Sequence, residues 1–384
     1  MAYYLTIKEL WRNKGRFFLI SLVIALITVL VLFIAALNEG LGNVNKEYLS
    51  KLDAQLLVFQ ANVSRSASAS RIDRSKLNDV RRLADVEAAG PLGIANGDLV
   101  FTNNRKPLEV SLIGVEASQP GSPPVILGQE ILLDRGNDCV IDINVANQRS
   151  LQIGDFIKIK TIQGTEEEYF DLRVAGITDS RQYLYNPSVF VPYITWDRIR
   201  PQPTAPNTLL PLVSNVIIVK LKNPSQEENV KHLIKTQIRE VEVVNIEDGI
   251  KALPGYSVQK STFNTQQTFT LLIGILVIGG FFQIQMLQKV PQTGVLKAIG
   301  ASNTTVAFAV ILQIVLVTTL GVFMGGIVTL ALSLALSEGI PVAFNGSAVL
   351  LAILSLLAIG PLGGLVSVRL AISVEPLIAL GLSS

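Results

Sequence analysis

The sequence contains very little of what metal and redox sites are made from. Its 384 residues include a single cysteine, Cys139, and a single histidine, His232. One cysteine excludes a disulfide within the chain, and these two residues cannot supply a zinc site of several thiolates or imidazoles. We expect Cys139 to be a small buried residue in a strand and His232 to be a solvated residue of a polar helix at 226–238. We predict no metal site and no cofactor.

Charge and catalytic motifs are also scarce. Charged residues make up 16% of the chain and the net charge is only +2, without the concentrated Lys and Arg of a nucleic-acid binder. No G-x-x-x-x-G-K-[S/T] stretch occurs, so the chain lacks the loop that cradles nucleotide phosphates. A lone histidine far from any serine motif argues against a nucleophilic triad. We therefore predict no catalytic residues, and we expect no nucleic-acid partner.

Long apolar runs are what the sequence has instead. Residues Phe17 to Leu37 carry no charge over 21 positions, close to the roughly 20 that a helix needs to cross the bilayer. This run is longer than the apolar region of a signal peptide, about 7–15 residues, so we interpret it as an uncleaved anchor. Three more apolar runs follow in the last third. The predicted transmembrane helices are 17–37, 263–288, 304–336 and 347–368.

The distribution of basic residues predicts the orientation of these helices. Seven lysines and arginines lie next to the ends of the spans that would share one side: Lys8, Arg12, Lys14, Arg16, Lys289, Lys297 and Arg369. By the positive-inside rule that side is the cytoplasm, which puts both termini there and leaves 38–262 and 337–346 outside. No charge falls in the middle of a span, which argues against a proton- or ion-coupled carrier. Energy for any transport must then come from a partner.

The segments outside the bilayer have distinct expected roles. Residues 1–16 form a predicted amphipathic helix on the membrane surface, with Ile7 and Trp11 on its apolar face and Lys8 and Arg12 among its basic residues. We expect helical character to continue after the first span through Tyr48. A cytoplasmic loop is predicted at 289–303 and a cytoplasmic tail at 369–384.

The large segment 38–262 has the pattern of an α+β domain. Short apolar or alternating runs bounded by turn residues indicate strands, and two polar periodic runs indicate helices. Predicted strands are 55–59, 98–102, 108–115, 140–143, 156–161, 169–177, 189–192, 216–221 and 241–246; predicted helices are 73–83 and 226–238. We expect a β-rich lobe near 128–200 inserted into this domain. The aromatic cluster between Tyr183 and Trp196 could be core or a partner-binding patch.

The loop 289–303 carries the most specific pattern. Val295, Leu296 and Ile299 have helical spacing between Gly294 and Gly300 and would form a short apolar ridge. The stretch 294–302, GVLKAIGAS, resembles the coupling loop of FtsX-like, MacB-type ABC transporter permeases, which reads approximately R-E-x-G-[IV]-L-[KR]-A-[IL]-G-A-[ST]. The order of one span, a large outer domain and three spans is similar as well, as is the tail at 369–376, and the resemblance covers essentially the whole chain. Compact size and the segments 37–42 and 64–70 look most similar to haem-exporter-type permeases.

The resemblance implies a fold and a set of partners. The fold would be four transmembrane helices with a MacB-type extracytoplasmic core domain between the first and second. The function would be that of a permease, coupled by mechanotransmission to two copies of a separate ABC-type ATPase, that exports or extracts a hydrophobic or amphipathic substrate as a homodimer in the cell membrane. An adaptor protein stays open as a further partner. The coupling residues would be Pro291, Gln292, Thr293, Gly294, Val295, Leu296, Lys297, Ile299 and Gly300.

Some alternatives remain at this point. The family's basic–acidic pair falls on Pro291 and Gln292, so the resemblance implies no charged contact there. Gly321 and Gly325, and the pair Gly279 and Gly280, predict close helix packing, either within the chain or between protomers. His232 could instead contact a ligand, for example as an axial ligand to haem iron. A non-transporting signalling subunit and a lipoprotein-releasing permease are the alternative functions.

Overall fold

The computed structural model describes residue 8 and residues 11–101, 106–202, 211–335 and 341–375. The chain divides into two units. We call Met1–Leu41 together with Gln259–Ser384 the helical unit, and Gly42–Val258 the sheet unit. Of the predicted features, Ile7, residues 337–340 of the outer loop and residues 376–384 of the tail lie outside the described residues.

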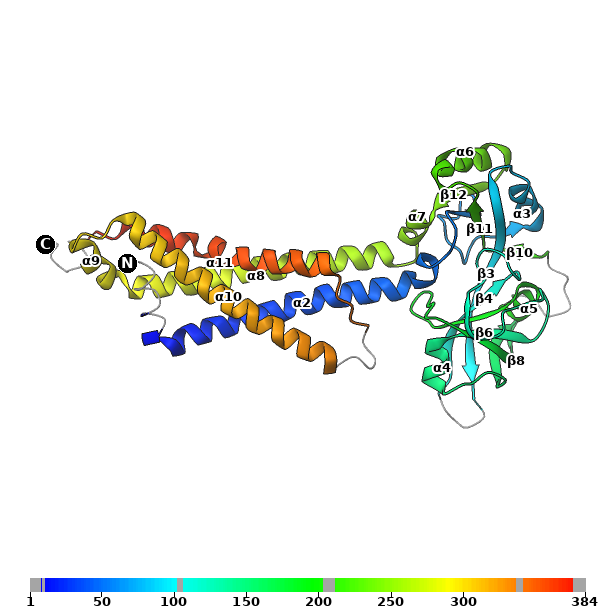
Figure 1. The fold of residues 1–384 in the computed structure, drawn as a ribbon, viewed down its shortest axis with the longest axis horizontal. Helices are drawn as coiled ribbons and strands as arrows, with labels where there is room; N and C mark the ends of the chain where they lie inside the picture. The colour runs from blue at the N-terminus through cyan, green and yellow to red at the C-terminus, as the bar shows by residue number, and fades with distance from the viewer. Residues whose placement is uncertain (1–7, 9–10, 102–105, 203–210, 336–340, 376–384) are drawn as a thin grey trace. The chain divides into compact units, whose positions relative to one another are not determined.

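Four of the described helices are long and apolar enough to cross a membrane, judged by length and composition (Figure 1). They are α2 (Lys14–Ser50), α8 (Tyr256–Gln288), α10 (Asn303–Ala335) and α11 (Gly346–Ser373). A short helix, α9 (Val290–Ala298), connects α8 to α10. The helix that begins before Phe17 continues past Leu37 to Ser50, so the predicted continuation through Tyr48 is confirmed.

Glycines set how closely these helices approach one another. A Cβ on Gly325 of α10 would lie 2.5 Å from Cβ of Thr28 in α2, and one on Gly321 would lie 2.6 Å from Ile24. A Cβ on Gly279 of α8 would lie 2.7 Å from the carbonyl oxygen of Gly363 in α11. The absence of a side chain at these positions therefore lets backbones pack within the chain, as small residues do in membrane bundles.

Gly280 differs from its neighbour. A Cβ built on it meets no atom of the described residues within 4 Å. Successive residues point about 100° apart around a helix, so only one of two adjacent glycines can face the same partner. The expectation of close packing at Gly280 finds no contact within the described part of this chain.

The sheet unit is built on one large mixed sheet. Its order is β12-β1-β11-β3-β4-β9-β6-β8-β5, and β7 pairs with β3 and β8. Most neighbours are antiparallel, whereas β4–β9 and β6–β8 are parallel. The strands are β1 (Leu56–Gln60), β3 (Val86–Val100), β4 (Leu108–Val115), β5 (Val125–Gly128), β6 (Asp138–Asp142), β7 (Phe156–Gln163), β8 (Glu166–Thr178), β9 (Ser188–Pro192), β11 (Val216–Leu221) and β12 (Val241–Asn245), with a separate pair β2 (Ile72–Asp73) and β10 (Val213–Ser214).

Helices cover this sheet at several points. They are α3 (Arg74–Arg81), α4 (Ile143–Arg149), α5 (Tyr193–Ile199), α6 (Glu227–Gln237) and α7 (Ile246–Lys251), with a 3₁₀ turn at Pro224–Gln226. Cys139 is fully buried in β6, as predicted, and burial raises the pKa of its thiol. His232 lies on α6 with an exposed side chain, which agrees with the solvated reading.

Strand β3 is longer than its sequence suggests. The predicted strand at 98–102 covers only its end, because Gly90, Pro91, Gly93 and Gly97 interrupt the apolar pattern. Gly93 is paired with Gly114 of β4. A Cβ on either glycine would lie 2.3–2.4 Å from Trp196 of α5, so the two glycines leave the space in which the indole sits. Trp196 also stacks on Tyr193.

The aromatic cluster is core rather than an open patch. Tyr183, Phe190, Tyr193 and Trp196 are buried, and only Tyr185 is exposed. Two of them belong to the cluster that packs around Leu112 and Ile141, and the other two belong to a second cluster around Leu92 and Val140. The ring of Phe190 also contacts Tyr48, with ring centroids 5.5 Å apart.

The last turns of α2 are bonded to the rest of the sheet unit. The hydroxyl of Tyr48 donates to the carbonyl of Gly121 at 2.8 Å. The carboxylate of Glu47 accepts a hydrogen bond from Ser180 at 2.7 Å. Lys51 pairs with Asp179 at 3.1 Å. These bonds fix the end of α2 against residues that lie more than 70 positions away in the sequence.

Candidate functional site

Helix α9 is bounded by residues suited to its two ends. Pro291 lies in its first turn, where the missing N–H costs no helical hydrogen bond. Gly300 follows its last turn with φ of +101°. There the amide of Gly300 donates to Lys297 and the amide of Ala301 donates to Leu296, the two bonds of a Schellman motif. The motif explains why the helix stops before Ser302.

The two faces of α9 differ. On the outer face, Val295 is 46% exposed and Ile299 is 77% exposed, and Pro291 is exposed one turn earlier. On the inner face Gly294 is buried, and Leu296 packs against the cluster of Met286, Val306 and Ala371. Exposed apolar side chains at i, i+4 and i+8 form a narrow apolar face, which we call the α9 ridge (Pro291, Val295 and Ile299). An exposed apolar face of this kind is typical of a surface that contacts another protein or a membrane.

Lys297 has a structural role within the helical unit. Its ammonium donates to the carbonyl oxygens of Ile372 at 2.5 Å and Val374 at 2.9 Å. These carbonyls belong to the end of α11, where helix C-termini lack intrahelical donors and carry partial negative charge. The side chain therefore ties α9 to α11 rather than extending along the α9 ridge.

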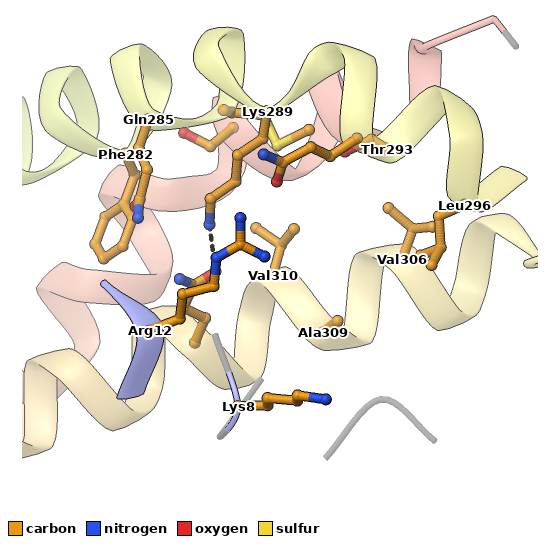
Figure 2. Close-up of a pocket in the computed structure, with 14 residues that line it drawn as sticks. Lys8, Arg12, Phe282, Gln285, Lys289, Thr293, Leu296, Val306, Ala309 and Val310 are labelled. Carbon is orange, nitrogen blue, oxygen red and sulfur yellow. Dashed lines mark hydrogen bonds between the residues drawn. The ribbon is translucent and has the colours of Figure 1, made fainter. Parts of the chain in front are cut away.

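A cavity of about 280 Å³ lies beside α9 (Figure 2). Three basic residues line it: Lys8 and Arg12 from the N-terminal segment, and Lys289 at the start of α9. Its apolar lining comes from α8, α9 and α10. We call it the basic pocket; its lining is Lys8, Arg12, Phe282, Gln285, Met286, Lys289, Gln292, Thr293, Leu296, Val306, Ala309, Val310, Gln313 and Ser367.

Buried polar side chains also reach the basic pocket. Gln285, Gln313 and Ser367 are 4%, 6% and 1% exposed, although they lie on apolar helices. Lys289 donates to Oε1 of Gln313 at 3.2 Å and lies over the ring of Phe17, 5.4 Å from its centroid. The Nε2 atoms of Gln285 and Gln313 and Oγ of Ser367 have no hydrogen-bond partner among the described residues. Buried polar groups are rarely left without partners, so these atoms indicate a missing partner.

The pocket brings together residues that the sequence assigned to separate features. Lys8 and Arg12 of the membrane-surface segment and Gln292, Thr293 and Leu296 of the coupling loop share its wall. Trp11, which precedes Arg12 in the sequence, is exposed. Neither Gln313 nor Ser367 was a predicted site residue, although a polar residue inside an apolar segment is a signal of function.

Among the described residues, no group of three or more His, Cys, Asp or Glu side chains is placed to hold a metal ion. His232 on α6 is exposed and belongs to no such group.

Four apolar helices, with an α+β unit placed between the first and second, define the class of multispan membrane proteins with one large inserted domain. The model of the MacB-like periplasmic core domain matches residues 17–237, more than half of the chain. The model of the FtsX-like permease C-terminal region matches residues 267–376. The chain therefore belongs to the FtsX-like permeases with a MacB-like periplasmic core domain and is a permease subunit of an ABC transporter. The predicted family and fold class are confirmed.

Similar proteins extend over nearly the full length of the chain. A putative hemin transport system permease protein HrtB of Staphylococcus haemolyticus is 27% identical over 381 residues, covering 97% of this chain and 98% of the relative. The protein of the same name from Staphylococcus epidermidis is 22% identical over 374 residues, with the same coverage of both chains. These relatives agree with the predicted haem-exporter-type branch.

Solved structures are similar to part of the chain. The extracellular domain of the ABC-type transporter YknZ from Gram-positive bacteria has 12% identity and a TM-score of 0.36, covering 50% of this chain and 100% of that chain. The periplasmic region of MacB from Actinobacillus actinomycetemcomitans has 15% identity and a TM-score of 0.36, covering 53% of this chain and 94% of that chain. The family places the inserted domain outside the cytoplasm and implies an ATPase partner.

Proposed function

We propose that this chain is the permease subunit of an exporter driven by a separate ATPase that docks on the α9 ridge. The observation that carries the proposal is the exposure of Val295 and Ile299 on a helix whose opposite face is packed. About one to two turns of apolar surface suit a small docking site that a larger contact would surround. Of the remaining coupling residues, Leu296 and Lys297 hold α9 against the neighbouring helices.

The orientation of the chain follows from the same reasoning. With the sheet unit outside, both termini and α9 lie in the cytoplasm, where an ATPase can reach them. The proposed topology has an outer domain at 38–262. Its cytoplasmic segments are 1–16, 289–303 and 369–384. The positive-inside distribution of Lys8, Arg12, Lys289, Lys297 and Arg369 supports it.

ATP-driven closure would act on the bundle through α9. Leu296 packs with Met286 of α8, Val306 of α10 and Ala371 of α11, and Lys297 is bonded to the end of α11. A displacement of α9 therefore changes contacts with three of the long helices at once. We propose that two copies of the chain and two copies of the ATPase form the working assembly, which transmits this motion mechanically.

The proposed substrate is an amphipathic compound of the haem class. The support is that two relatives covering 97% of the chain are named hemin transport permeases. The test is stimulation of ATP hydrolysis by the reconstituted permease–ATPase complex with haem, phospholipids and peptides supplied in turn. Stimulation by lipids or peptides instead of haem would reject this substrate class, and ATP-dependent regulation without cargo movement would indicate a signalling subunit.

Docking is tested by charge on the α9 ridge. The double variant Val295→Asp and Ile299→Asp should reduce capture of the ATPase by the tagged permease by about tenfold or more. Docking would bury the two new carboxylates, and removing a carboxylate from water is costly. The matched control places the same substitutions on exposed apolar residues of the sheet unit, Ile153 (47% exposed) and Phe156 (74% exposed). Unchanged capture by the α9 variant, or an equal loss in the control, would contradict the proposal.

A further inference from the structure

Docking of an ATPase on the α9 ridge does not explain the basic and polar lining of the basic pocket. We propose that this pocket binds the phosphate of an anionic phospholipid from the cytoplasmic leaflet. This binding site presupposes the orientation proposed above. The relevant features are three cations, a set of buried hydrogen-bond donors and an apolar wall, all on one cavity of about 280 Å³.

The charge of the pocket selects an anion. Lys8, Arg12 and Lys289 line it, and among the residues that the structure describes no aspartate or glutamate does. Their positive charges are gathered from segments separated by more than 270 residues, so their proximity is a product of folding. Basic pockets between transmembrane helices on the cytoplasmic side are the usual sites for anionic lipid headgroups.

The hydrogen-bonding capacity of the pocket also selects an acceptor. Lys289 donates to Oε1 of Gln313, so the amide of Gln313 is oriented with its Nε2 donor available. The Nε2 atom of Gln285 and the hydroxyl of Ser367 are buried and have no partner among the described residues. Amide N–H groups donate and phosphate oxygens accept, and hydrogen bonds to a charged acceptor are the stronger kind.

The apolar wall favours a lipid over a soluble anion. Apolar side chains line the pocket together with these polar groups: Phe282, Val306 and Val310, which Figure 2 labels, and also Met286. A free phosphate would leave this surface without a partner, whereas the glycerol and upper acyl carbons of a phospholipid would cover it. One ligand thereby satisfies both kinds of lining.

Occupancy of the pocket would be linked to coupling. One side of α9 lines the basic pocket through Gln292, Thr293 and Leu296. The other side of the same helix carries the α9 ridge. A lipid that favours one position of α9 changes ATPase affinity, and the ATPase changes lipid affinity by the same factor.

The binding test uses the full-length permease without its ATPase, so that failure of docking cannot affect it. Protein in nanodiscs of phosphatidylcholine and phosphatidylglycerol is extracted into detergent, and retained lipids are identified by native mass spectrometry. The wild type should retain phosphatidylglycerol in preference to phosphatidylcholine. The triple variant Lys8→Gln, Arg12→Gln and Lys289→Gln should lose its charge-assisted hydrogen bonds to the phosphate. Its affinity for phosphatidylglycerol should therefore fall by about tenfold or more.

The control variant removes the same charge elsewhere in the helical unit. Lys14, Arg16 and Arg369 are exposed basic residues outside the pocket lining, and their replacement by glutamine should leave phosphatidylglycerol retention unchanged. Gln313→Leu, which keeps every charge and similar bulk, should also weaken retention. Equal loss in pocket and control variants, or full retention in both pocket variants, would overturn the proposal. Complete displacement of phosphatidylglycerol by millimolar inorganic phosphate would assign the site to a soluble anion and would likewise overturn it.

Discussion

Lys297 of α9 and Ile372 of α11 are joined by a hydrogen bond of 2.5 Å from the lysine ammonium to the isoleucine carbonyl oxygen. A second bond, to Val374 at 2.9 Å, makes this lysine a cap on the last turn of α11. The sequence assigned Lys297 to the ATPase-facing loop, and its pattern could not distinguish a partner-facing lysine from one that holds the loop. The position of α9 therefore depends on the end of another helix 75 residues away.

Loss of this cap should loosen α9. In Lys297→Met, two helix-terminal carbonyls lose their donor, and amide hydrogen exchange of residues 290–300 should become roughly fivefold faster, as expected for about 1 kcal/mol. Hydrogen–deuterium exchange with mass spectrometry of the detergent-solubilised permease measures this. Lys297→Arg keeps donors and charge and should stay close to the wild type. Identical exchange in Met and wild-type proteins would show that the cap does not restrain α9.

A methyl group added at Gly325 of α10 should disturb helix packing, whereas one added at the next residue, Gly326, should not. Gly325→Ala places Cβ 2.5 Å from Thr28 Cβ and 2.6 Å from the carbonyl oxygen of Ala25, so α2 and α10 must move apart. The expected cost is about 1–3 kcal/mol. Thermal aggregation midpoints by size-exclusion chromatography should fall for this variant.

The adjacent position provides the control for that measurement. A Cβ on Gly326 meets no atom of the described residues within 4 Å, so Gly326→Ala should be neutral or slightly stabilising, since alanine favours a helix. Equal midpoints for the two variants would mean that the bundle adjusts without cost at Gly325.

The sheet unit should lose stability in acid partly through Asp179. Partial burial alone would raise the pKa of this carboxyl, but hydrogen bonds from Arg181 and Lys51 outweigh it and hold the pKa below its usual value. A carboxyl whose folded pKa is depressed contributes stability above its unfolded pKa, near 3.9, and that contribution is lost as the pH falls through the folded pKa. Asp179→Asn should therefore be less stable than the wild type at pH 7, and this difference should shrink as the pH falls from the unfolded pKa through the folded pKa.

Trp196 offers a local probe of this difference. In a Trp11→Phe background it is the only tryptophan, and urea unfolding followed by its fluorescence reports on the sheet unit. Asp53→Asn, which removes a carboxylate that is 84% exposed, is the control and should change the midpoint little at either pH. A constant gap between Asp179→Asn and the wild type from pH 7 to pH 3 would contradict the assigned ion-pair role.

Local patterns predicted many elements of the sheet unit. The strands β4 and β11 were predicted with their observed limits, because their apolar runs are bounded by clear turn residues. Most of β3 was missed, since Gly93 and Gly97 weaken the strand pattern while serving close packing. Strand propensity cannot anticipate that Gly93 and Gly114 make room for a tryptophan contributed by a later helix.

Part of the candidate site could be predicted from the sequence, and part of it could not. The sequence predicted a ridge of Val295, Leu296 and Ile299. In the structure Val295 and Ile299 are exposed, whereas Leu296 packs against Met286, Val306 and Ala371. The basic pocket was not predicted, because Arg12, Lys289 and Gln313 belong to three segments whose distances no sequence spacing encodes. Gln285 gave a partial signal as a polar residue near the inner end of an apolar span.

The sequence by itself determined the number of long helices and the class of the protein, because a helix must match the bilayer with its own apolar length and a signature loop is contiguous in the chain. Tertiary structure alone decided which glycines touch a neighbour, where Lys297 is bonded and which polar groups meet in one cavity. The lining of that cavity brings together residues up to 359 positions apart, from Lys8 to Ser367. The energies of these contacts depend on the positions that packing allows, and local preferences along the chain do not contain that information.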